Sequence, residues 1–130
     1  MAYKLGSRSE ERISDIHPDL QAVVRLAIAK TEVDFTVLEG MRTRARQRLL
    51  VGAGASTTMN SRHLNGHAVD LGAYVGAKVV WTWPEYHKIA DAMKAAADEL
   101  GIEITCGADW KTFPDGPHFQ LSWSAYPSRS

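Results

Sequence analysis

The sequence predicts an α+β domain in which helices pack on a small antiparallel sheet. The chain has 130 residues, of which 45% are hydrophobic, and this is enough for one domain with one core. Segments with helical spacing of apolar residues are mixed with short strand-like runs. Two of these runs follow each other across Gly76, which is typical of antiparallel pairing. We therefore expect a single domain over residues 1–130, with no second domain.

The first half of the chain predicts two helices and one strand. A helix begins at Pro18, because proline suits a first turn and apolar residues recur at helical spacing in DLQAVVRLAIAKTE. FTVLEG, Phe35–Gly40, has the composition of a strand closed by glycine. TRARQRLLVGAG predicts a second helix that ends near Gly52 or Gly54. The small, polar GASTTMNSR that follows predicts a loop.

The second half predicts four strands and one helix. AVDLGAY and KVVWTW form the expected pair around Gly76. A helix starts at Thr82, which can cap the free amides, with Pro84 in the first turn and Glu85 completing a capping box. Gly101 can end this helix. IEITCG and HFQLSW then predict two further strands.

Composition excludes several classes of protein. Fifteen Lys and Arg balance fifteen Asp and Glu, which argues against a nucleic-acid-binding or polybasic membrane-surface protein. No apolar run is long enough to span a bilayer, and the N-terminus lacks the apolar core of an export signal. The single cysteine, Cys106, cannot form an intramolecular disulfide, and we expect it to pack as a small hydrophobe. We therefore expect a soluble, cytoplasmic product.

The stretch SRHLNGHAVDL carries the first candidate site. If AVDLG is a strand, Val69 and Leu71 face the core and Asp70 faces the other side. A half-buried carboxylate needs a partner, because an unpaired buried charge is costly. His63, at the end of the preceding loop, is a suitable partner, and a neutral imidazole with a carboxylate makes a good ligand pair for zinc. The alternative is that His63 and Asp70 simply form a hydrogen bond.

The stretch GADWKTFPDGPHFQL carries the second candidate site. A zinc site on His63 and Asp70 lacks a third ligand, and His118 is the best remaining candidate. Asp115 lies three residues earlier on a turn rich in proline and glycine. From there it could act as general base for a zinc-bound water without ligating the metal. The alternative is that Asp115 is only a turn residue.

The other histidines are weaker candidates. His63 and His67 are four residues apart, as in the HExxH zinc peptidases, but no glutamate follows His63 and Asn65-Gly66 interrupts a helix. We expect His67 to flank the site, and His17 and His87 to be structural or exposed.

Taken together, the motifs resemble the D-Ala-D-Ala/L-Ala-D-Glu zinc metallopeptidase family. The matching pattern is Ser61-x-His63-x-x-Gly66-x-Ala68-x-Asp70, then Asp115-x-x-His118. GMRTRARQRLLVGAGAS and GADW with DGPHFQL also resemble segments of that family. The N-terminal SEERISDIHPDLQAVVRLAI is similar to phage endolysins of the L-alanyl-D-glutamate endopeptidase type. The resemblance implies a Hedgehog/D-Ala-D-Ala-peptidase-like fold.

The resemblance also implies roles for particular residues. One zinc ion would be bound by three ligands, His63, Asp70 and His118. Asp115 would be the catalytic base, Arg42 would hold the substrate or its oxyanion, and Ser61 would lie near the substrate. The neighbouring Arg44, Arg46 and Arg48 keep the ordinary interpretation of a solvated helix face. Gln120 departs from the family's pattern, in which the resemblance implies glutamate at this position in many members.

The implied function is that of a phage endolysin. Such an enzyme hydrolyses the L-Ala–D-Glu bond of the peptidoglycan stem peptide and lyses the host cell. It needs no export signal, because it can accumulate in the host cytoplasm and reach the wall once the membrane is permeabilised. We expect a monomer without a separate wall-binding domain.

The sequence leaves three alternatives open. The same site could serve a D-Ala-D-Ala carboxypeptidase or dipeptidase, or a non-catalytic zinc-binding module that recognises the wall. A non-haem iron oxygenase also uses two histidines and one carboxylate. Its first two ligands usually form His-x-Asp, however, whereas six residues separate His63 from Asp70.

Overall fold

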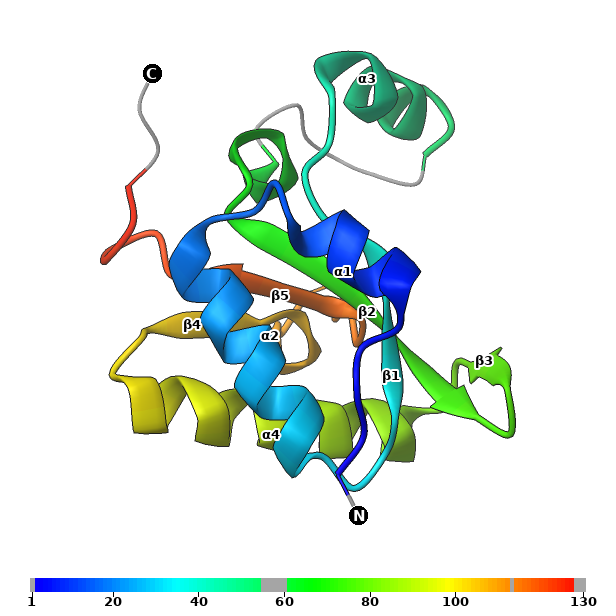
Figure 1. Ribbon diagram of the computed structural model, residues 1–130. Helices are drawn as coiled ribbons and strands as arrows, with labels where there is room; N and C mark the ends of the chain where they lie inside the picture. Colours follow the sequence, from blue (N-terminus) through cyan, green and yellow to red (C-terminus); the bar gives the residue numbers. More distant parts are fainter. Residues whose placement is uncertain (1, 55–60, 113, 128–130) are drawn as a thin grey trace.

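The centre of the fold is an antiparallel sheet. The structure, a computed structural model, describes residues 2–54, 61–112 and 114–127. Within these residues five strands pair in the order β1-β2-β5-β4, and β3 pairs with the end of β2 (Figure 1). The strands are β1 Phe35–Glu39, β2 Ala68–Val75, β3 Lys78–Val80, β4 Ile104–Cys106 and β5 His118–Leu121. All pairs are antiparallel, which confirms the predicted α+β class.

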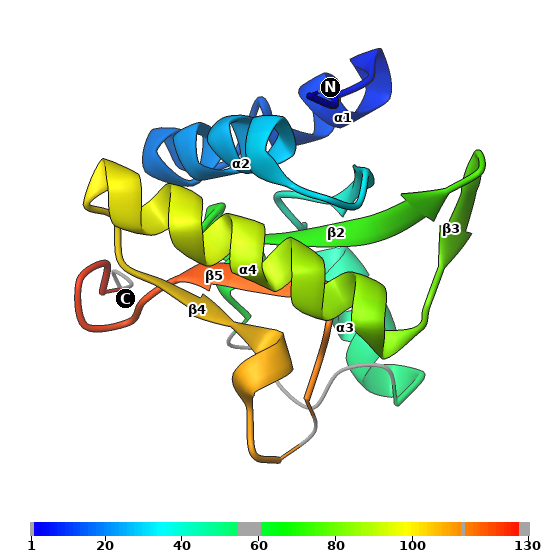
Figure 2. The same ribbon diagram turned by 90° about the horizontal axis from the view of Figure 1, so that it is seen from below.

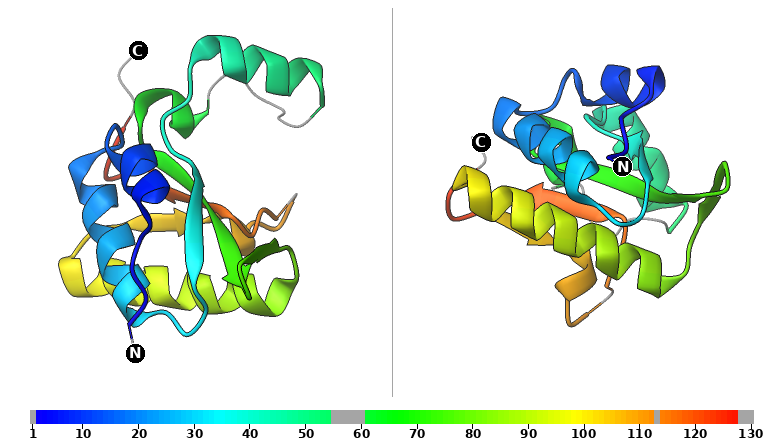
Figure 3. Two further views of the ribbon diagram at one scale, coloured as in Figure 1. Left: turned by 45° about the vertical axis from the view of Figure 1, so that its right-hand side comes forward. Right: turned by 60° about the horizontal axis from the view of Figure 1, so that its bottom comes forward.

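Helices lie around this sheet. They are α1 Ser7–Ile13, α2 Pro18–Lys30, α3 Arg44–Gly52 and α4 Trp83–Leu100, with short 3-10 turns η1 Arg62–Asn65 and η2 Gly107–Asp109. Figure 2 shows α4 running along the sheet with α2 packed beside it. In the left-hand view of Figure 3, α3 stands apart from these two helices, at the end of the molecule where η1 lies. No helix in the described part of the chain has the length and apolarity needed to cross a membrane.

The core lies between the sheet and the two long helices. Val69 and Leu71 of β2 and Phe119 and Leu121 of β5 are fully buried. They cluster with apolar side chains of α2 and α4, including Val23, Val24, Ile89 and Met93. Because side chains alternate along a strand, the residues next to these in sequence face away from the core; they are Asp70, His118 and Gln120.

Several predicted elements are confirmed. Helix α2 begins at Pro18, and α4 ends before Gly101, which adopts the left-handed conformation expected of a helix C-cap. The β2–β3 turn contains Gly76 and Ala77, both with positive φ, as a tight two-residue hairpin requires. Cys106 is buried, and this burial raises the pKa of its thiol to about 11.

Other predictions need correction. The capping box at α4 is incomplete, because the Thr82 hydroxyl donates to the Glu85 carboxylate and accepts no backbone amide. The strand expected over KVVWTW covers only Lys78–Val80. Of the predicted loop GASTTMNSR, residues 55–60 lie outside the described residues, and Arg62 already belongs to η1.

Helix α1 was not predicted. It packs beside β1, where the Ser9 and Thr36 hydroxyls are 3.0 Å apart and Arg12 Nη1 donates to the Val37 carbonyl at 2.8 Å. Gly40 permits this close approach, because a Cβ there would lie 2.2 Å from the Arg12 carbonyl oxygen. Helix α1 thus packs against β1 and Gly40, which lie just before Arg42 in the chain.

Candidate metal centre

Three side chains from three different elements meet on the sheet face opposite the core. His63 comes from η1, Asp70 from β2 and His118 from β5. One ligand atom of each lies within 4.8 Å of the others, so the group can hold a metal ion. His63 Nε2 and His118 Nδ1 are each 3.3 Å from Asp70 Oδ1. The structure therefore brings together the three residues that the sequence predicted as ligands.

The orientation of His63 is fixed by its other ring nitrogen. Nδ1 lies 2.8 Å from the Gly40 carbonyl oxygen, which can only accept a hydrogen bond. Nδ1 therefore carries a proton, and the lone pair of Nε2 is available on the side of Asp70. The side chain is 2% exposed, so the ring has little freedom to turn. Ser61 starts η1, because its hydroxyl accepts the His63 backbone amide at 3.2 Å.

His118 is oriented through the other ring nitrogen, Nε2. Its Nε2 lies 2.8 Å from Gln120 Oε1, so Nε2 donates and Nδ1 is left available beside Asp70. Gln120 thus supplies the acceptor that orients this candidate ligand, although a neutral amide polarises the ring less than a carboxylate would. The indole of Trp110 packs against the same imidazole, with ring centroids 5.1 Å apart.

Asp70 is ionised in this setting. Burial alone would favour its neutral form, but His118 and His63, whose facing nitrogens donate to Asp70 when the rings carry a second proton in place of a metal ion, outweigh burial and hold the pKa of Asp70 well below its usual range. A carboxylate that is already deprotonated is the form that binds a metal ion.

Arg42 lies beside Asp70. Its Nη2 is 3.5 Å from Asp70 Oδ2, and its side chain is almost buried. Two parallel hydrogen bonds of 2.9 and 2.8 Å join its guanidinium to the Glu39 carboxylate, and Nη1 donates to Gln47 Oε1 at 2.8 Å. The Arg42 backbone amide also donates to the His63 carbonyl at 2.7 Å. The guanidinium is therefore fixed next to the ligand group, as a bidentate pair allows.

Glu39 and Gln47 were not predicted as site residues. Glu39 lies opposite Asp70 in the β1–β2 register, a neighbour relation that the sequence alone does not reveal. Gln47 is the buried residue of α3, whereas Arg44, Arg46 and Arg48 of this helix are exposed as expected.

Asp115 lies on the turn that leads into β5. Partial burial of its carboxyl and the charge of Asp70 raise the pKa of Asp115, while His118, His63 and Arg42 partly offset this rise. The Asp115 carboxyl is thus within electrostatic range of the whole ligand group. A raised pKa makes the Asp115 carboxylate a stronger base, as a general base requires.

Gly107 explains the position of this turn. The Asp115 amide donates to the Gly107 carbonyl at 2.9 Å, and the His118 amide donates to the Asp115 carbonyl at 3.2 Å. A Cβ at Gly107 would lie 2.3 Å from the Asp115 carbonyl oxygen and 3.0 Å from His118 Cβ. Only glycine therefore lets the turn pack this closely against η2.

Arg62 connects η1 to the segment that follows β5. It is 2% exposed, and its Nη2 donates to the carbonyls of Leu121 and Ser122 at 3.1 and 3.2 Å. Its guanidinium also stacks on Trp123 at 4.0 Å. Arg62 thus fixes η1, and with it His63, to the segment after β5. The sequence shows no pattern that singles it out.

The remaining histidines lie outside the metal group, in agreement with the prediction. His17 caps α2, because its Nδ1 accepts the Asp19 amide at 3.0 Å. His67 packs edge-on against the His17 ring. His87 is exposed and stacks on Trp83.

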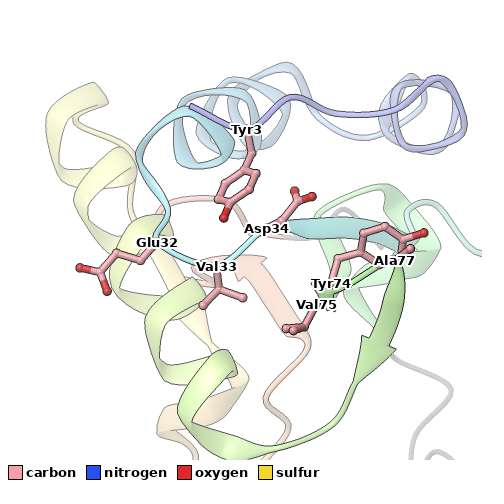
Figure 4. Close-up of a pocket in the computed structure, with 8 residues that line it drawn as sticks. Tyr3, Glu32, Val33, Asp34, Tyr74, Val75 and Ala77 are labelled. Atoms are coloured by element: carbon pink, nitrogen blue, oxygen red, sulfur yellow. The ribbon is translucent and has the colours of Figure 1, made fainter. Parts of the chain in front are cut away.

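A surface pocket of about 440 Å³ lies elsewhere, near the β2–β3 hairpin (Figure 4). It is lined by Tyr3, Glu32, Val33, Asp34, Tyr74, Val75, Gly76 and Ala77. Asp34 accepts the Phe35 amide at 2.8 Å, burial raises its pKa, and Glu32 lies 3.9 Å from Lys88. These carboxylates have partners within the fold, and none of the three candidate ligands lines this pocket.

The fold and the ligand group define a class of protein, namely small α+β domains with a two-histidine, one-carboxylate site on an antiparallel sheet. The model of the phage L-alanyl-D-glutamate peptidase family matches residues 1–121. The chain belongs to this family.

Individual relatives agree with this assignment. The L-alanyl-D-glutamate peptidase of Escherichia phage T5 is 34% identical over 119 residues, which cover 88% of this chain and 87% of that protein. The peptidase of the same name from Listeria phage A118 is 32% identical over 92% of this chain, which spans only 43% of that longer protein. The crystal structure of the Serratia marcescens L-Ala D-Glu endopeptidase ChiX has a TM-score of 0.90 and 51% identity, covering 94% of this chain and 92% of that chain.

Proposed function

We propose that this protein is a zinc-dependent endopeptidase that hydrolyses the L-Ala–D-Glu bond in the stem peptide of bacterial peptidoglycan. The observation that carries the proposal is the meeting of His63, Asp70 and His118 in a chain of this peptidase family. The name L-alanyl-D-glutamate peptidase, which two of the relatives share, indicates the bond that is cut, and the three side chains indicate hydrolysis with a metal ion.

The donor set supports zinc as the metal. Two imidazole nitrogens and one carboxylate are typical zinc ligands, and three protein ligands leave a fourth position open, as in catalytic sites. Each histidine has its second nitrogen engaged, His63 by Gly40 and His118 by Gln120, as is usual for metal ligands. A zinc ion bound there supplies Lewis acidity that lowers the pKa of water to about 7.

The surrounding side chains have separate tasks in this proposal. Asp115 takes the proton from the attacking water and passes it to the leaving amine. Arg42, held by Glu39, binds the substrate and stabilises the negative charge that develops on the carbonyl oxygen. Ser61 positions the substrate near His63.

The biological role in this proposal is host lysis. The enzyme is made in the host cytoplasm, reaches the wall after the membrane is permeabilised, and works as a monomer on peptidoglycan. The phage origin of two of the relatives supports this role.

The direct test uses a soluble stem pentapeptide that ends in D-Ala-D-Ala, together with metal analysis of the purified protein. We expect about one zinc ion per chain and products L-Ala and a tetrapeptide that begins with D-Glu. Release of D-Ala would instead assign a carboxypeptidase. Zinc binding without cleavage of the pentapeptide or of any intact wall would assign a binding module. Iron in place of zinc would contradict the proposed chemistry.

A further inference from the structure

Two tryptophans at the start of α4 expose large aromatic surfaces. Trp81 is 64% exposed and Trp83 is 43% exposed. Trp81 stacks on the buried ring of Tyr86, with centroids 6.1 Å apart and planes 12° from parallel. Trp83 stacks on His87 in a similar way, at 5.4 Å and 29°. Exposed aromatic rings held in fixed orientations are typical of an interaction surface, which we call the Trp81–Trp83 patch.

This patch adjoins the turn that carries Asp115. A Cβ at Gly116, the next residue, would lie 3.1 Å from Tyr86 Cβ and 3.3 Å from Trp83 Cζ3. Figure 2 shows the first turn of α4 beside the segment that joins η2 to β5. Trp83 therefore lies beside the turn that carries Asp115 and leads into β5.

The chemistry of the substrate places a sugar close to the reacting bond. In a stem peptide, L-Ala is the residue attached to the glycan strand, so one residue separates the L-Ala–D-Glu bond from the glycan. A residue spans at most about 3.5 Å, so an enzyme that cuts this bond must accommodate the glycan at the edge of its site. Sugar rings have apolar faces that can stack on exposed aromatic rings.

The charges around the patch also fit a neutral ligand. Glu85 and Lys88, in the first turns of α4, carry opposite charges. Thr82 and His87 supply polar groups at its border. A sugar, with an apolar face and hydroxyls at its rim, matches this arrangement better than a charged peptide does.

We propose that the Trp81–Trp83 patch is a subsite for the glycan strand, next to the L-Ala side of the bond that is cut. This inference rests on the proposed function. The two indoles stack on sugar rings and hold the attached stem peptide against Asp115 and the ligand group. The protein thereby binds the wall through its catalytic domain.

The first test compares two soluble substrates that share one stem peptide, one attached to its disaccharide and one free of sugar. We expect the ratio of kcat/KM for the sugar-bearing to the free peptide to fall about tenfold in Trp81→Ala/Trp83→Ala. Trp81→Phe should retain most of this ratio, because it keeps an aromatic face. Tyr3→Ala is the matched control, since Tyr3 is an exposed aromatic residue that lines the pocket of Figure 4 and is not part of the patch, and it should keep the wild-type ratio. An unchanged ratio in the double variant would overturn the subsite.

The second test measures binding to glycan strands from which an amidase has removed every stem peptide, so it needs no cleavage. We expect wild-type protein and Tyr3→Ala to sediment with the strands, and binding of Trp81→Ala/Trp83→Ala to be at least about fivefold weaker. Absence of wild-type binding would overturn the inference even if the L-Ala–D-Glu bond is cut. Binding that depends on the two tryptophans would support it even if that bond is not cut.

Discussion

The two histidines of the ligand group are oriented by different kinds of acceptor. His63 donates to the backbone carbonyl of Gly40, which no substitution of a side chain removes. His118 donates to the side chain of Gln120, which can be changed. The second nitrogen of a metal-binding histidine fixes its tautomer, so the contribution of this contact can be measured at His118 alone.

We predict that Gln120→Leu weakens zinc binding by about 10- to 100-fold, because the Nε2 donor of His118 loses its acceptor. Gln120→Glu should bind zinc at least as tightly as the wild type, since a carboxylate accepts the same hydrogen bond. Competition with a chromophoric zinc chelator measures both affinities. Equal affinity of Gln120→Leu and wild type would show that this contact does not orient the ligand.

Substitutions of Asp115 and of His118 should distinguish a loss of catalysis from a loss of metal binding. Asp115→Ala is expected to keep full zinc occupancy and to lose turnover by about 100-fold or more, because the general base is removed. His118→Ala is expected to lose zinc and activity together. Metal analysis and peptide cleavage assays on the same preparations measure the zinc occupancy and the turnover of both variants. An active Asp115→Ala enzyme, or a fully zinc-loaded His118→Ala protein, would contradict these roles.

Motif spacing predicts residues that act through their own chemistry and misses residues that act through packing. His63, Asp70, His118 and Asp115 have titratable side chains in short, ordered motifs. Glu39 and Arg62 belong to no motif of this kind, because their roles depend on neighbours that are distant in sequence. Glu39 matters because β1 pairs with β2, and Arg62 because the chain after β5 returns over η1. These relations arise only in the folded chain.

At the level of elements, the turn between η2 and β5 positions the proposed base. Its geometry depends on Gly107, where a Cβ would lie 2.3 Å from the backbone oxygen of Asp115. We predict that Gly107→Ala displaces this turn and lowers kcat by about tenfold or more, together with a loss of about 1–3 kcal/mol of stability.

Gly52→Ala is the matched control for this substitution. A Cβ at Gly52, at the end of α3, meets no atom within 4 Å, so activity and stability should stay close to those of the wild type. Assays of kcat and denaturant unfolding compare the two variants. A fully active Gly107→Ala enzyme would show that the close packing of the turn is not needed for catalysis.

Elements with their own local pattern were predicted, and elements that depend on contacts were not. Helices α2 and α4 have apolar stripes, a proline in the first turn and, in α4, a terminal glycine. Helix α1 has only seven residues, which is too short to be stable in isolation. Its hydrogen bonds to β1 stabilise it, and periodicity does not reveal them.

In the whole molecule, the ligand group joins η1, β2 and β5, so metal binding should stabilise the fold. We predict that zinc at about 100 times its Kd adds about 2.7 kcal/mol, and that a chelator lowers Tm. Burial alone would lower the pKa of His118, but its hydrogen bond with Asp70 raises this pKa above the ordinary value. A proton therefore competes with the metal, and the zinc-induced rise in Tm should be smaller at pH 5.5 than at pH 7.5.

Calorimetry with and without a chelator measures this effect, and His118→Ala, which lacks one ligand, should show no shift. A Tm of the wild type that does not respond to zinc at either pH would contradict a metal site at these three residues.

We propose that this fold cuts the L-Ala–D-Glu bond with a metal held by His63, Asp70 and His118. Mass spectrometry of purified peptidoglycan, digested by the zinc-loaded protein with and without a chelator, tests it most directly. We expect new free amino termini on D-Glu that are absent with chelator and return when zinc is restored. Release of D-Ala alone, or the same D-Glu termini in the presence of chelator, would contradict the account.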